Sequence, residues 1–332
     1  IVGAPAGVRG ISLFLVPRWR VNADGSRGAR NDVRLAGLNH KMGQRGSVNT
    51  FLKFGEAGDC VGYLVGQPHQ GLACMFHMMN EERIGVGMGA VQQGCAGYLY
   101  SLQYARERRQ GRHPDQKDPD SPPLPIIEHA DVRRMLLQQK CYVEGAQVLG
   151  FHAAVLIDRA QDPEEAVRRD SGLLLEILTP IIKAWGSDYS LKANELAMQI
   201  LGGYGYTREY PVEQNYRDNR INPIHEGTNG IQALDLLGRK VLMDGGKKFG
   251  RFARLIEGFL KENAARPELA EFTGPLGKLL ADTAALTAEI GAKAKANPDE
   301  VGAASVPYLR IVGHLTYAWL WARMAALALD RA

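Results

Sequence analysis

The feature that most constrains this fold is the long apolar pattern that begins at residue 71. Residues 71–110 keep apolar side chains at helical spacing for many turns. Similar patterns return later, in segments separated by short breaks, at 130–160, 171–185, 190–203, 230–243 and from 249 onward. Helices joined by short connections usually pack antiparallel, so this part of the chain predicts a helical bundle.

Proline and glycine mark the breaks between these helices. Residues 111–125 are polar and contain repeated prolines, which prevent a continuous helix. Pro180 predicts a break or kink within its helical segment, and Gly202-Gly203 predict a C-cap. Ligand sites in such an architecture lie between facing helices or beside the preceding module.

Residues 1–67 have a different character, rich in glycine and β-forming residues. Segments 11–16, 48–54 and 59–66 predict strands, and the turn-forming stretch 23–28 connects strand-like sequence. The fold class is therefore mainly α with a partial β region. We expect domains at 1–67, 68–245 and 246–332. Both ends look cut, which indicates a piece of a longer protein.

Composition narrows the function classes. Apolar residues make up 45% and charged residues 23%, as in globular proteins, and the formal net charge is only +4. No run of lysine and arginine indicates a nucleic-acid face, whereas a mildly basic chain suits a small polyanion such as a dinucleotide or coenzyme A. The four cysteines lack metal-ligand spacing and indicate reduced thiols, most of them in the core. The apolar stretch 317–329 is too short to span a membrane, so we expect a cytoplasmic protein.

The segment "INPIHEGTNGIQ", residues 221–232, contains the candidate catalytic group, Glu226. Alone, such a glutamate is more often an ordinary loop charge. In the functional interpretation, Gly227 allows a tight turn, Thr228 caps the next helix, and a semi-buried carboxylate acts as a general base.

Two further segments could contact a phosphorylated ligand. Gly202, Gly203 and Gly205 follow a helix, where they form either a simple C-cap or a close approach to a flat or phosphorylated ligand. The arginines around 106–112 form either a solvated helix end or a phosphate clamp. Residues 85–91, also rich in glycine, indicate close helix packing. The eight histidines show no metal-binding spacing, and we predict no metal site.

Taken in order, these segments resemble the acyl-CoA dehydrogenases. Residues 197–232 are similar to the family's Q-x-x-GG-x-G…EYP-x-E…RD…EGT pattern, and "KMGQRGS", "NEERIG" and "YARERRQGR" are similar to upstream landmarks. The likeness covers residues 1 to about 245. The remainder resembles the extra helical domain of the longer fatty-acyl and methylthiopropanoyl-CoA types. The resemblance implies the remainder of a β-barrel-like domain, then the dehydrogenase bundle and a truncated helical extension.

The resemblance also implies a chemistry. Glu226 would remove the pro-R α-proton of an acyl-CoA while the β-hydride passes to N5 of FAD, giving a trans-2-enoyl-CoA as in fatty-acid β-oxidation. The Glu226 amide would bind the thioester oxygen, a contact worth about 3 kcal/mol. The implied partners are electron-transfer flavoprotein and further copies of the chain, in a homodimer or homotetramer.

The family's other site residues carry over as follows. Asn80 and Arg83 would lie beside the pantetheine chain and Gly227 beside the acyl chain. The residues implied to bind FAD are Arg108, Gln110, His129, Gln199, Gly202, Gly203, Thr228, Asn229 and Gly230. Among these, Arg108 and Gln110 would reach the FAD of a neighbouring subunit. Gln110 stands where the family often has a hydroxyl residue, and the family's N-terminal helical domain and early β segment are missing.

Two alternatives to this function remain open. The first is an alkylation-response-type flavoprotein with a DNA-binding role, for which the lysines and arginines at 247–254 would supply a basic patch, although Glu257 and Glu262 interrupt it. The second is a non-catalytic interaction protein on the same scaffold. The presence of a carboxylate at position 226 argues against this second alternative.

Overall fold

The computed structural model describes residues 1–331, and the side chains of all of them except His77 and Asn80. The chain forms two compact units, Ile1–Glu82 and Arg83–Ala332, and helix α1 (Gly71–Glu107) begins in the first and continues in the second. The boundaries predicted at 67/68 and 245/246 mark changes in sequence pattern and remain predictions.

The first unit contains three separate antiparallel strand pairs. They are β1 (Leu13–Leu15) with β6 (Tyr63–Val65), β2 (Trp19–Val21) with β3 (Arg27–Arg30), and β4 (Val33–Leu38) with β5 (Thr50–Phe54). The strands predicted within 11–16, 48–54 and 59–66 are confirmed, and so is the turn at 23–28, where Asp24 Oδ1 accepts the Ser26 amide at 2.9 Å. The strands β2, β3 and β4 were not predicted.

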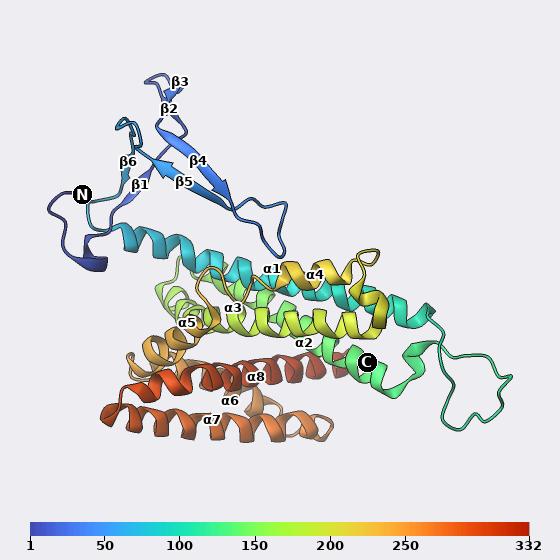
Figure 1. Ribbon diagram of the computed structural model, residues 1–332. Helices are drawn as coiled ribbons and strands as arrows, with labels where there is room; N and C mark the ends of the chain where they lie inside the picture. The colour runs from blue at the N-terminus through green and yellow to red at the C-terminus, as the bar shows by residue number, and fades with distance from the viewer. Residues whose placement is uncertain (332) are drawn as a thin grey trace. The chain divides into compact units, whose positions relative to one another are not determined.

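The second unit is helical, as the apolar patterns predict. After α1 come α2 (Ala130–Arg159), α3 (Glu165–Leu201), α4 (Val212–Asn219), α5 (Asn229–Leu234), a π-helical turn (Asp235–Leu242), α6 (Lys247–Glu262), α7 (Ala270–Ala296) and α8 (Asp299–Leu329). Helices α2 and α3 lie along each other, as do α7 and α8, and the loop after α1 extends from the end of the bundle (Figure 1). Each long helix of this unit therefore contacts other helices, which fix the position of its side chains.

A break or kink was predicted at Pro180; helix α3 continues through this residue, so a break is wrong, and a kink remains a prediction. A proline inside a helix leaves the carbonyl four residues earlier without its usual donor. Here that carbonyl belongs to Glu176, and the ammonium of Lys240 donates to it at 2.6 Å. A distant lysine thus satisfies the group that proline releases, and the helix remains continuous.

Close helix contacts depend on particular glycines. A Cβ at Gly87 would lie 2.7 Å from the carbonyl oxygen of Ile182 on α3, whereas a Cβ at Gly85 or Gly89 would meet nothing within 4 Å. The close packing predicted for residues 85–91 is confirmed at Gly87. Helix α3 also contacts α8, where the ring of Trp185 stacks on Tyr317 with centroids 3.6 Å apart. Helix α3 is therefore the central helix of this unit.

The structure shows the exposure of the cysteines and the length of the apolar helices. The four cysteines are free thiols, but three are half-buried and Cys141 is exposed, so the prediction that most lie in the core was wrong. Local packing, which composition does not report, decides their exposure. None of the helices within residues 1–331 is long and apolar enough to cross a membrane.

Candidate active site

The loop between α4 and α5 has the backbone geometry that a tight turn requires. Gly227 has φ 85°, as its predicted role needs, and the Thr228 side chain accepts the Ile231 amide at 3.4 Å as the N-cap of α5. Both predictions are confirmed. Glu226 itself has φ 52°, one of three non-glycine residues at positive φ among those described. This conformation is costly for a side chain with Cβ, so the surrounding contacts must maintain it.

The side of the loop before Glu226 is held by a series of buried amides. Asn222 donates to Asn219 Oδ1 at 2.8 Å, Asn219 donates to Asn194 Oδ1 at 2.6 Å, and Asn194 donates to the Gln93 carbonyl at 2.9 Å. A His225 ring nitrogen lies 3.0 Å from Asn222 Oδ1. These bonds connect the residue before Glu226 to α3 and α1.

The side after Glu226 is held by Asn229. Its Nδ2 lies within hydrogen-bond distance of the Ala184 carbonyl, Ser187 Oγ and Asp188 Oδ1, at 2.8 to 3.1 Å. Its Oδ1 accepts a hydrogen bond from the Lys183 ammonium at 3.0 Å. The Asn229 side chain therefore faces α3, and only its backbone could contribute the FAD contact that the resemblance implies.

Within this segment the carboxylate of Glu226 is exposed rather than semi-buried as expected. The loop turns at Glu226 and Gly227, both of which have positive φ. Gln232 is fully buried, and its side-chain amide donates to the Gly227 carbonyl at 3.3 Å, which stabilises the turn. The result is a fixed backbone that presents an accessible carboxylate.

A second group of predicted residues meets at the far end of α3. The Arg108 guanidinium lies 5.8 Å from the centroid of the Tyr204 ring, in the turn after Gly202 and Gly203. A His129 ring nitrogen lies 2.7 Å from the Gln110 carbonyl. Arg108 also borders an aromatic groove of about 450 Å³, which is lined by Tyr100, Gln103, Tyr104, Glu107 and Tyr210. The structure thus brings the arginine-rich segment and the glycine-rich turn together.

The nearby arginines differ in role. Arg109 donates to the Pro123 carbonyl at 3.2 Å, and Arg112 donates to the Ser121 carbonyl at 2.8 Å. These two side chains hold the loop that follows α1 by hydrogen bonds, so their role is structural. Arg108 is exposed and directed to the glycine-rich turn, so it is the member suited to a phosphate.

The backbone around the glycine-rich turn fits a dinucleotide. Gly202 has φ 60°, and a Cβ added at Gly202 or Gly203 would meet nothing within 4 Å, so a ligand can approach the main chain there. Gln199 is exposed one helical turn earlier, whereas Gly205 packs against Met198. Open backbone, an exposed guanidinium and tyrosine rings are chemically appropriate for a flavin dinucleotide.

The remaining predicted substrate contacts, Asn80 and Arg83, are residues of α1. Arg83 is buried, and its guanidinium pairs with Asp235 at 3.3 Å. Asp235 also pairs with Arg239 at 2.8 Å. The side chain of Asn80 lies outside the described residues. Arg83 therefore has a structural partner on the π-helical turn in addition to any role toward a substrate.

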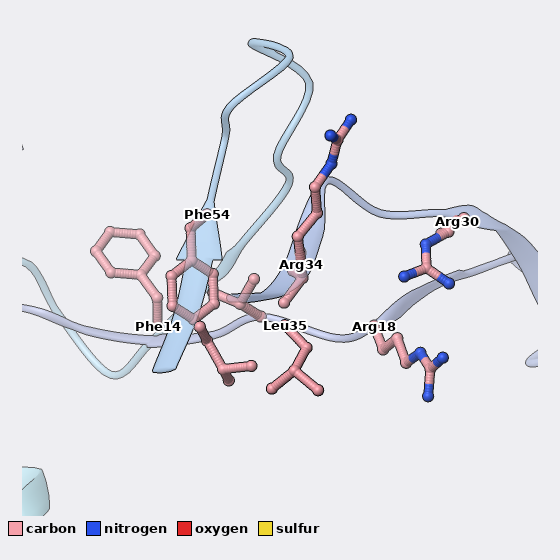
Figure 2. A pocket seen from close by; sticks show the side chains of 9 residues that line it. Phe14, Arg18, Arg30, Arg34, Leu35 and Phe54 are labelled. Carbon is pink, nitrogen blue, oxygen red and sulfur yellow. The ribbon is translucent and has the colours of Figure 1, made fainter. Parts of the chain in front are cut away.

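A separate concavity of about 560 Å³ lies on the strand unit. Phe14, Leu35 and Phe54 gather at one end of it, and Arg18 and Arg30 lie at the other (Figure 2). None of the residues predicted for catalysis or cofactor binding lines it.

Sequence reasoning missed Lys183, Asn222 and Gln232, which fix the loop. Each occupies a position where a helical or loop pattern permits a polar side chain, so exposure was the natural expectation. An amide or ammonium amid an apolar pattern was the available signal, because buried polar groups need specific partners.

Together, the fold and this loop define a helical-bundle protein that presents a carboxylate between two buried polar anchors. Residues 69–242 match the acyl-CoA dehydrogenase, C-terminal domain, and residues 252–332 match the acetyl-CoA dehydrogenase C-terminal-like domain. The chain belongs to the acyl-CoA dehydrogenase family.

Relatives and solved structures agree with this membership. The chain is 40% identical to 3-methylmercaptopropionyl-CoA dehydrogenase of Ruegeria pomeroyi, over 95% of this chain and 53% of that protein. It is 36% identical to a broad-specificity linear acyl-CoA dehydrogenase of Mycobacterium tuberculosis, over 98% of this chain and 55% of that protein. The chain thus spans about half the length of these curated relatives.

Two solved structures share the fold. Caenorhabditis elegans ACDH-11 in complex with C11-CoA aligns with a TM-score of 0.77 at 19% identity, over 95% of this chain and 50% of that one. An acyl-CoA dehydrogenase from Bacillus anthracis complexed with FAD aligns with a TM-score of 0.71 at 22% identity, over 90% of this chain and 51% of that one. The helical arrangement described above is therefore that of the family.

Proposed function

We propose that the full-length protein is an FAD-dependent acyl-CoA dehydrogenase in which Glu226 is the α-proton base. The observation that carries this proposal is the loop geometry. Glu226 is held at positive φ between two hydrogen-bonded anchors, with its carboxylate accessible. Strained backbone that the surroundings fix is a recurrent property of catalytic positions.

FAD and residues of the chain would each have a separate role in the reaction. FAD, when bound, supplies the hydride acceptor. The Glu226 carboxylate takes the proton from the carbon next to the thioester carbonyl, and the Glu226 backbone amide donates to the thioester oxygen, which lowers the energy of the charge that develops there. Gly227 would lie beside the acyl chain, next to the base.

The second cofactor-binding group supports an oligomer. The contacts of Asn229 on α3 begin at Ala184, whereas the glycine-rich turn begins at Gly202, a separation of roughly 27 Å along the helix axis at 1.5 Å per residue. We therefore assign Arg108 and Gln110 to the FAD of a neighbouring subunit, in a homodimer or homotetramer. Electron-transfer flavoprotein is the electron acceptor that we propose for the reduced enzyme.

The DNA-binding alternative lacks a supporting observation. Within the basic segment at 247–254, the Lys248 ammonium lies 3.1 Å from Asp244 and 3.4 Å from Glu176, and Arg251 donates to Asp170 at 2.7 Å. Half of the four basic side chains are thus neutralised within the chain. The alternative is therefore not favoured.

The proposal is tested with the full-length protein purified with FAD. A panel of acyl-CoAs is added without oxygen and the flavin absorbance is followed. We expect bleaching by at least one acyl-CoA, whose chain length identifies the substrate class. We also expect Glu226→Gln to slow bleaching roughly 100- to 10,000-fold, the usual contribution of a general base.

Glu257→Gln, which neutralises an exposed carboxylate on α6, is the matched control and should bleach at the unsubstituted rate. If no acyl-CoA bleaches the flavin, the proposed activity is wrong. If Glu226→Gln bleaches as fast as the control, the assignment of the base is wrong.

A further inference from the structure

Lys183 is a fully buried lysine in the middle of α3. Its neighbours along the helix, Ile181, Ile182 and Ala184, are buried apolar residues of the main core. Burial lowers the pKa of Lys183 to about 8, opposed mainly by the nearby Asp188. Burying an ammonium is unfavourable, and an apolar side chain of similar size usually stabilises such a position as well or better. Stability alone therefore does not explain a lysine here.

The contacts of Lys183 lead to the catalytic loop. Its ammonium donates to Asn229 Oδ1 at 3.0 Å. The Asn229 backbone amide in turn donates to the Pro223 carbonyl at 3.0 Å, which closes the loop across Glu226. Arg83 and Glu226 are the other charged groups close enough to influence Lys183. Lys183 thus connects the rigid core of α3 to the loop through a single amide.

We propose that Lys183 is a positioning residue that holds Glu226 in place through Asn229. This inference rests on the proposed function of Glu226. The ammonium has only donors, so it fixes which end of the Asn229 amide is the oxygen and turns the Nδ2 toward the Ala184 carbonyl and Asp188. With the amide fixed in this orientation, the backbone of residue 229 keeps its bond to Pro223, and Glu226 keeps its positive φ.

The amide series at Asn222, Asn219 and Asn194 anchors only the opposite side of the loop. Loss of Lys183 would therefore remove the charged donor to Asn229 Oδ1, and only the bonds of Asn229 Nδ2 to α3 would hold this side of the loop. The segment from 223 to 231 would gain freedom, while the hydrogen bonds before Asn222 would remain. A local effect of this kind differs from a general weakening of α3.

The experiment uses the full-length protein with FAD and compares Lys183→Met, Asn229→Ala and the double variant. Lys192→Met, which removes a lysine from a less buried position of the same helix, is the control. Three readouts are taken: kcat and KM for the best acyl-CoA, hydrogen exchange of residues 223–231, and the midpoint of thermal unfolding.

We expect Lys183→Met to lower kcat about tenfold or more, to change KM less than threefold, and to speed exchange of residues 223–231 without changing the distal part of α3. The thermal midpoint should move by only a few degrees. The double variant should be no slower than the slower single variant, because both substitutions break the same connection. Lys192→Met should match the unsubstituted protein.

An unchanged kcat, additive losses in the double variant, or faster exchange along all of α3 would each overturn the inference. These outcomes are distinct from failure of the proposed function. If the unsubstituted protein does not dehydrogenate any acyl-CoA, the proposed function is wrong, and the exchange measurements still decide whether Lys183 holds the loop.

Discussion

The strand unit and the helical unit differ in how they bury their apolar side chains. In the strand unit, every residue of β5 is exposed, and Phe51 is 58% exposed. In the helical unit, Phe252 of α6 and Trp319 of α8 are almost completely buried, with ring centroids 6.1 Å apart. Separate strand pairs satisfy their backbone locally but bury little, and a single pair is marginally stable. Long helices packed on several neighbours enclose a core, and the loop that carries Glu226 is anchored to that core.

The largest expected contrast is between two phenylalanines. Phe252→Ala should lower the free energy of unfolding of the helical unit by about 3–5 kcal/mol, because it empties a fully buried site beside Trp319. Phe51→Ala on β5 should cost less than about 0.5 kcal/mol. Urea unfolding of the full-length protein, followed by the helical circular dichroism signal at 222 nm, measures the first effect.

Hydrogen exchange of residues 48–66 measures the second. A loss of more than about 1 kcal/mol of unfolding free energy for Phe51→Ala would contradict the expected difference between the units. It would mean that other residues of the full-length protein cover this face of β5.

The same contrast explains which elements sequence reasoning found. Apolar or alternating patterns predicted β1, β5 and β6, but the arginine-containing strands β2, β3 and β4 were not predicted, and only pairing identifies them. The long helices followed from their apolar patterns, whereas the short polar helix α4 was not predicted. The carbonyl that Pro180 leaves without its helical donor is bonded by Lys240, a residue on another element, and no local pattern reports that partner.

The candidate site was also predictable only where local sequence determines the structure. Local chemistry gave the turn at Gly227 and the N-cap at Thr228, because both depend on adjacent backbone. The positive φ of Glu226 and the contact between Lys183 and Asn229 depend on segments distant in sequence. A lysine in a helical pattern normally indicates an exposed position, and only packing shows that this one is buried.

A pair of glycines on α1 tests how closely the helical unit is packed. Gly87→Ala should cost about 1–3 kcal/mol, because its Cβ would lie 2.7 Å from the Ile182 carbonyl oxygen. Gly85→Ala, in the same helix with open space around it, should be neutral or stabilise by up to about 1 kcal/mol. Urea midpoints of the two variants provide the comparison. Equal midpoints would show that α1 and α3 can separate without cost.

The smallest expected effect is a difference in acid sensitivity between the units. Burial, reinforced by Arg323 and Arg159, lowers the pKa of His152 on α2 to about 4. Its ring is nearly perpendicular to the ring of Trp319, with centroids 5.5 Å apart. In the unfolded chain a histidine titrates near 6.5. The unfolded state therefore binds more protons between pH 6.5 and 4, and stability present above pH 6.5 is lost as the pH falls through that window.

Allowing for partial solvent screening, we expect His152 to account for a loss of about 1 kcal/mol between pH 7 and pH 5. Urea midpoints at the two pH values measure it, and His152→Gln should reduce the difference by that amount. His40→Gln, at an exposed histidine of the strand unit, is the matched control and should leave the difference unchanged. If His40→Gln reduced the pH dependence as much as His152→Gln, the buried histidine would not be its source, and burial would not explain a difference in acid sensitivity between the two units.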